Sequence, residues 1–138
     1  MTAFLILWLA FSPDLASVQA EPDLAKRSEL ALANADQTID AARQAWTGGD
    51  LQAVESALNE IRQSVEISYD SLHQSREHPR SSKFYKRCEL KTLSLLRRLN
   101  TLRDDVDVEN REMVEAVIKR LRELHDELLT DIMTKRKS

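Results

Sequence analysis

The 138-residue sequence contains little cysteine, glycine, proline or aromatic residue, and each scarcity excludes a class of structure. A single cysteine, Cys88, excludes an internal disulfide framework, so stability must come from packing. Two glycines, three prolines and sparse β-branched residues are atypical of β-rich domains. The sequence is instead rich in Leu, Ala, Glu, Arg and Lys, which are strong helix formers. This composition predicts an all-α protein.

The sequence also lacks the standard motifs of catalytic and cofactor sites. It contains no Cys-x-x-Cys-His for covalent haem, no His-Glu-x-x-His of zinc proteases and no Glu-x-x-His pair of di-iron bundles. An oxyanion hole usually needs a strand-to-helix turn or a glycine-rich loop, and the chain has glycine only at Gly48 and Gly49. We therefore expect a protein that is not an enzyme and that carries no cofactor.

The first twenty residues have the pattern of a secretory signal peptide. A nine-residue apolar run, Ala3–Phe11, is followed by polar residues and then by Val18 and Ala20 at the −3 and −1 positions before Glu21. The run is too short to span a bilayer, which takes about twenty apolar residues. This pattern predicts removal of residues 1–20 and export of a soluble protein to the periplasm or the extracellular space.

One feature of the signal-peptide pattern is missing, because neither residue before the apolar run is Lys or Arg. The alternative interpretation is a retained N-terminal helix that packs into a cytosolic core. Cleavage after Ala20 leaves residues 21–138, a length typical of one domain.

Apolar residues recur at helical spacing through four segments of the predicted mature chain. The turn Gly48-Gly49, followed by Asp50 as an N-cap, makes the first two segments antiparallel neighbours. Four helices joined by short links predict an antiparallel up-down-up-down four-helix bundle. The competing arrangement is a homodimer in which two long helical hairpins pair between chains. The predicted helices cover about 23–47, 50–77, 82–104 and 108–134.

The third segment has a three-four alternation of seam residues that is typical of a coiled coil. A residue on this seam faces the core, so Cys88 is expected to be a buried small residue. The first segment carries many alanines on its apolar stripe, which predicts a close approach to a neighbouring helix. No internal sequence repeat relates the segments. The seam consists of Tyr85, Cys88, Thr92, Leu95, Leu99, Leu102 and Val106.

Charge is distributed unevenly along the chain. Residues 21–75 hold four basic and ten acidic residues, residues 76–103 nine basic and two acidic, and residues 104–138 seven basic and ten acidic. In the middle segment, five cations recur three, four or seven residues apart, so they share one helix face. They form a basic strip: Arg80, Lys83, Arg87, Lys91 and Arg98.

The basic strip has two interpretations. One is a solvated face that complements acidic helices within the bundle. The other is a binding surface for an anionic envelope component or an acidic protein. Nucleic acid is not an expected partner, because the predicted protein is exported and the chain has a net charge of −3.

A second candidate site is a metal site formed by His73, Cys88 and His125. With a rise of about 1.5 Å per residue, an up-down bundle brings these three residues to similar heights. They can converge only if all three face inward, and Cys and His bind soft metals well. The alternative is a core cysteine with two histidines at the rim of the apolar stripes. A haem pocket is disfavoured because Met113 and Met133 share a helix with His125.

These observations predict an exported, non-enzymatic helical bundle that acts as an interaction or structural module of the cell envelope. Its partner is not identified by any motif in the sequence. The alternative function is a metal- or haem-binding bundle with ligands near His73, Cys88 and His125.

Overall fold

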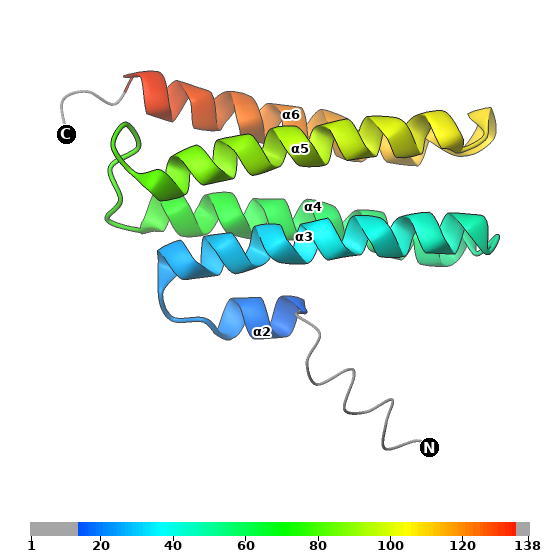
Figure 1. Ribbon diagram of the computed structural model, residues 1–138, viewed down its shortest axis with the longest axis horizontal. Coiled ribbons are helices and arrows are strands. Elements are labelled where there is room, and N and C mark those ends of the chain that lie inside the picture. The colour runs from blue at the N-terminus through cyan, green and yellow to red at the C-terminus, as the bar shows by residue number, and fades with distance from the viewer. Residues whose placement is uncertain (1–13, 135–138) are drawn as a thin grey trace, which may run out of the picture.

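The computed structural model describes residues 14–134, and this part of the chain contains helices and no strand. The all-α class predicted from composition is confirmed. None of the helices in this range has an apolar stretch long enough to cross a membrane. The elements, shown in Figure 1, are α2 (Leu15–Ala20), α3 (Leu24–Thr47), α4 (Leu51–Gln74), α5 (Lys83–Asp105), a 3₁₀ turn (Val108–Asn110) and α6 (Arg111–Thr134).

Short polar side chains fix the starts of the long helices. Asp23, Asp50 and Ser82 are the N-caps of α3, α4 and α5, and each accepts hydrogen bonds from first-turn backbone amides. Between α3 and α4, Gly49 has a φ of +76°, a conformation that costs other residues energy because of their Cβ atom. The first three long helices therefore begin within one residue of the predicted positions.

Helix α4 ends at Gln74, three residues before the predicted boundary at 77. The side chain of Ser75 ends it, since Ser75 Oγ donates to the Leu72 carbonyl at 2.6 Å while the backbone of Ser75 turns extended. The same carbonyl accepts a hydrogen bond from the Tyr85 hydroxyl at 3.2 Å. The end of α4 is thereby tied to the start of α5 across the link.

The long helices form two hairpins, α3–α4 and α5–α6, that pack against each other in the same orientation (Figure 1). Helix α3 lies beside α5 and α4 beside α6, whereas α4 and α5 touch only over a short stretch. Two ion pairs between α3 and α5, Arg87–Glu29 and Arg98–Asp40, each join residues 58 positions apart, as parallel neighbours require. The predicted sequential bundle instead places every helix beside the next one, so the observed order of neighbours differs at α4 and α5.

The α3–α4 pair has the most extensive helix contact within the described residues. Ala31, Ala35 and Ala42 are fully buried on α3, and Ser64 and Ser68 are fully buried on α4. Short side chains let two helix axes approach closely. The close contact of α3 with a neighbouring helix, predicted from its alanines, is confirmed. Larger side chains fill the space shared by the hairpins, among them Ile39, Ile61, Leu72, Leu95, Leu99, Leu121 and Leu128.

The short helix α2 packs on α3 and α4, on the side of α3 away from α5 (Figure 1). Its one buried residue is Val18, which is 1% exposed. This helix belongs to the predicted signal peptide, whose apolar run Ala3–Phe11 lies outside the described residues. In the full chain, the last part of the predicted signal peptide is therefore a packed helix.

Candidate functional site

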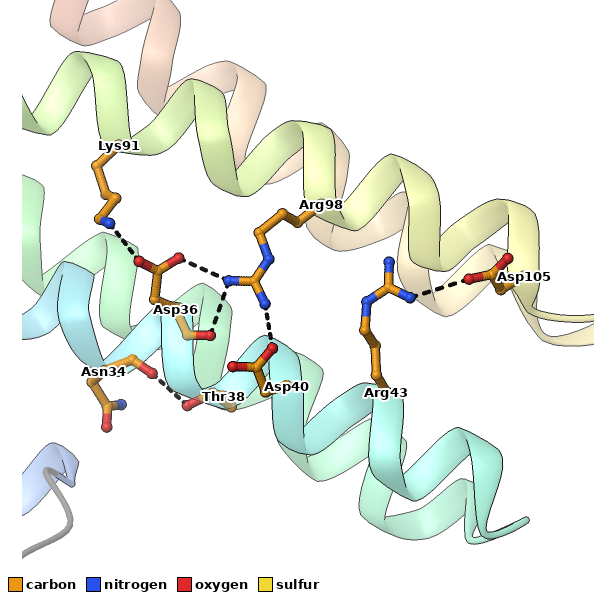
Figure 2. A network of polar contacts seen from close by, with 8 residues as sticks. All are labelled: Asn34, Asp36, Thr38, Asp40, Arg43, Lys91, Arg98 and Asp105. Atoms are coloured by element: carbon orange, nitrogen blue, oxygen red, sulfur yellow. Dashed lines mark hydrogen bonds and ion pairs between the residues drawn. The ribbon is translucent and has the colours of Figure 1, made fainter.

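The C-terminal half of the basic strip faces α3 and pairs with its carboxylates, as Figure 2 shows. Lys91 Nζ lies 2.5 Å from Asp36 Oδ2, and Arg98 Nη1 donates to Asp36 Oδ1 at 3.0 Å. The guanidinium of Arg98 also donates to the Asp36 carbonyl at 3.2 Å and to the Asp40 carboxylate. These two cations thus join α5 to α3 within the molecule.

The ion pairs between α3 and α5 continue toward the C-terminal ends of the two helices, where the cation and the carboxylate have exchanged helices. There the cation is on α3, and Arg43 Nη1 donates to Asp105 Oδ2 of α5 at 3.1 Å (Figure 2). On another face of α3, Thr38 Oγ1 bonds to the Asn34 carbonyl at 2.7 Å. The α3–α5 contact is therefore a series of charge-assisted hydrogen bonds, which are stronger than neutral ones.

The N-terminal half of the basic strip is different. Arg87 pairs with Glu29 at 2.7 Å, but the two side chains are 58% and 38% exposed, and ion pairs contribute little where water reaches them. Lys83 and Arg87 lie over the ring of Phe84, at 5.4 and 6.0 Å from its centroid. Within residues 14–134, neither Arg80 nor Lys83 forms an ion pair. The start of α5 therefore carries cationic charge that no carboxylate of the described region neutralises.

A groove of about 380 Å³ lies between α3 and α5, and the cations that line it are Arg87 and Lys91. Leu32 and Leu90 are its apolar lining residues, and Leu90 is 52% exposed. The surface combines positive charge with apolar area, a pairing suited to ligands that are both anionic and amphipathic. Its lining residues are Glu29, Leu32, Arg87, Leu90, Lys91 and Ser94.

The three predicted metal ligands have separate hydrogen-bond partners. His73 Nε2 lies 2.7 Å from Asp131 Oδ2, and His125 Nε2 lies 3.2 Å from Glu89 Oε2. Cys88 is buried beside Ser68, with Sγ and Oγ 3.5 Å apart. Among residues 14–134, no group of three or more His, Cys, Asp or Glu side chains could hold a metal ion. The structure does not bring His73, Cys88 and His125 together as a ligand set.

Cys88 lies in a buried chain of polar side chains. Burial raises the pKa of its thiol to about 11, so the thiol is protonated and unreactive at neutral pH. Thr92 Oγ1 donates to the Cys88 carbonyl at 2.7 Å and accepts from the Tyr69 hydroxyl at 3.4 Å. Burial also raises the pKa of Tyr69. At neutral pH the Cys88 thiol and the Tyr69 hydroxyl are therefore both protonated.

Sequence reasoning missed Glu89, which is 7% exposed and bridges Lys86 on its own helix and His125 on α6. Burial acts to raise the pKa of the Glu89 carboxyl, but hydrogen bonds from Lys86 and His125 outweigh it and hold the pKa below the usual value. Its position in the sequence could have identified Glu89, because it directly follows the seam residue Cys88 and lies three residues after Lys86.

The site is therefore a surface at the start of α5, with unneutralised cations, an aromatic ring and a shallow groove. Such a surface can bind an anionic partner, whereas the histidines and the thiol form internal contacts. The chain matches no protein-family model, no curated protein and no solved structure.

Proposed function

We propose that the protein is an exported, non-enzymatic helical module that binds an anionic component of the cell envelope through the start of α5. The observation that carries this proposal is the division of the basic strip. Lys91 and Arg98 are engaged by α3, whereas Arg80 and Lys83 form no ion pair with a described residue. The first pair joins α5 to α3, and the second is available to a partner.

Binding an anion costs less free energy at a cation that has no internal ion pair. An anion that binds Arg80 or Lys83 disrupts no internal ion pair, whereas one that binds Lys91 must compete with Asp36 at 2.5 Å. Near an anionic membrane surface, each Lys or Arg contributes about 1 kcal/mol of attraction. Phe84 adds apolar area beside the cations, which favours an interface over bulk water.

Two properties of the sequence support the rest of the proposal. The apolar run with small residues at −3 and −1 before Glu21 supports export through a secretory pathway. The scarcity of glycine and the lack of catalytic motifs support a binding role. We take an anionic membrane lipid as the partner to be tested.

The test is cosedimentation of the chain that begins at Glu21 with lipid vesicles. Vesicles of phosphatidylglycerol present an anionic surface, and vesicles of phosphatidylcholine present a neutral one. We expect binding to the first alone, weakened by added salt because screening reduces surface attraction. The double variant R80E/K83E should bind about thirtyfold more weakly or worse, since two favourable contacts of about 1 kcal/mol are lost and repulsion is added.

The matched control is R97E/K119E, which makes the same charge change at two exposed cations elsewhere. It should weaken vesicle binding less than about threefold, and circular dichroism should show unchanged helicity in both variants. Equal losses in the two variants would make the attraction a property of net charge alone. No binding to phosphatidylglycerol vesicles would reject a lipid partner and direct the search to acidic proteins.

A further inference from the structure

The predicted cleavage site lies in a part of the chain that the folded protein holds in place. Val18, the −3 residue, is 1% exposed where α2 packs on α3 and α4. Ala20, the −1 residue, is exposed but is the last residue of α2. The two side chains that a signal peptidase must recognise are thus fixed in a helix, and one of them is buried.

The bond to be cut is held on both sides. Its amide nitrogen, that of Glu21, donates a hydrogen bond to the Val18 carbonyl at 3.1 Å. The Glu21 carbonyl accepts a hydrogen bond from Arg27 Nε at 2.8 Å, and the Glu21 carboxylate accepts one from the Asp23 amide at 3.1 Å. Residues on either side of the bond are therefore tied to the helix that precedes it and the helix that follows it.

Hydrolysis needs a different geometry. Proteases cut segments that are exposed and can be opened into an extended form. Signal peptidase reads small side chains at −3 and −1, and water then splits the peptide bond. The products are a carboxylate on Ala20 and a free amino group on Glu21. In the folded chain, α2 must leave its site and unwind before these steps can occur.

We infer that the bond between Ala20 and Glu21 is a processing site that is open before the bundle folds and closed once α2 has docked. The inference rests on the proposed export, because it requires a signal peptidase substrate. Folding and processing then compete. A chain that folds first keeps α2 as a cover over α3 and α4, whereas a chain that is cut first loses that cover. The contacts of Glu21 with Arg27 and Asp23 lie within residues 21–27 and remain in the processed chain.

The experiment compares two orders of addition for the full chain in detergent micelles with purified signal peptidase. In one, unfolded chain is diluted from urea directly into the peptidase; in the other, the chain refolds first and the peptidase is added afterwards. Mass spectrometry measures the fraction that begins at Glu21. We expect rapid cleavage in the first order and at least tenfold slower cleavage in the second.

A substitution at the −3 position separates burial from recognition. Val18→Ala keeps a small residue that the peptidase accepts but removes buried methyl groups, so α2 opens more often. Cleavage of the refolded chain should rise about three- to tenfold, while cleavage of the refolding chain should not change. The control is Gln19→Ala, a change at an exposed neighbour that should alter neither rate.

Three outcomes would each contradict a different part of the inference. Equal rates for the two orders of addition overturn it while leaving the signal peptide intact. A refolded Val18→Ala chain that is cut no faster than the original overturns the role of Val18. Cleavage in neither order overturns both the processing site and the proposed export, and supports α2 as a permanent part of the folded domain.

Discussion

Glu89 of α5 and His125 of α6 lie with Oε2 and Nε2 3.2 Å apart, in a contact where both side chains are about nine-tenths buried. A buried carboxylate is costly unless it is hydrogen-bonded, and Lys86 Nζ supplies a second donor at 3.0 Å. The pair joins α5 to α6 within the bundle. It therefore contributes to which residues of α5 and α6 face each other.

The Glu89 pair predicts a dependence of stability on pH. The folded-state pKa of Glu89 lies below its ordinary value of 4.5, so its contribution is present above that pH and is lost as pH falls through the folded pKa. Glu89→Gln should lower the free energy of unfolding at pH 7 by about 1–3 kcal/mol, and the difference should shrink below about pH 4. Urea unfolding between pH 3 and pH 7 measures both effects. The exposed Glu55→Gln should show neither, and a constant difference at all pH values would refute this origin of the effect.

The link from Arg98 to Asp36 and Asp40 predicts a modest, salt-dependent stability effect. Arg98→Ala removes hydrogen bonds to two carboxylates and one carbonyl, at a partly exposed position. We expect a loss of about 1 kcal/mol in low salt and less in 1 M salt. Arg97→Ala, at an exposed neighbour, is the control and should change the unfolding free energy by less than about 0.5 kcal/mol. An Arg98→Ala loss that is the same at both salt concentrations would argue for lost packing instead of lost charge.

The close α3–α4 contact predicts sensitivity to added volume. Ala35 is fully buried, so Ala35→Leu forces the two helices apart and should cost about 1–3 kcal/mol. Ala33 lies on the same helix but is exposed, and Ala33→Leu should be nearly neutral. Thermal unfolding followed by circular dichroism compares the two. Equal stability of both variants would mean that the helices do not pack through this alanine in solution.

The environment of Cys88 predicts an unreactive thiol. Its side chain is fully buried, and burial raises the thiol pKa to about 11, so few thiolates form at pH 8. Labelling with iodoacetamide should be slow in the native protein and fast in urea. Rapid native labelling would show that the α4–α5 contact opens frequently, and that finding would reopen Cys88 as a site for chemistry.

Local features of the fold could be predicted because they depend on adjacent residues. N-cap side chains and the Gly48-Gly49 turn set helix starts, and the alanines of α3 indicated its close neighbour. The predicted end of α4 lies three residues too far along the chain. The side chain of Ser75 competes with the helix for the Leu72 carbonyl, and the spacing of apolar residues does not reveal such competition. The apolar stripes could not predict which helices of the two hairpins lie side by side. A stripe identifies the buried face of a helix, but it does not identify the helix that packs against that face.

The candidate site could also be predicted only in part from the sequence. Spacing placed the cations of the basic strip on one face, but it could not tell Lys91, which pairs with Asp36, from Lys83, which pairs with no carboxylate of the described region. That distinction depends on contacts between residues more than fifty positions apart. Glu89 was missed because charged residues are usually solvent-exposed.

The parallel placement of the hairpins has a consequence for how the chain acquires its structure. Each hairpin closes through a short link, so its internal contacts form without bringing distant residues together. Contacts between the hairpins, such as that of Arg98 with Asp36, join residues 62 positions apart and require a longer loop to close. Loop closure over such separations slows folding, so we expect the contacts within each hairpin to form before the contacts between the hairpins. In that order of events, the charged contacts of α5 with α3 form late and favour the alignment in which the two hairpins join.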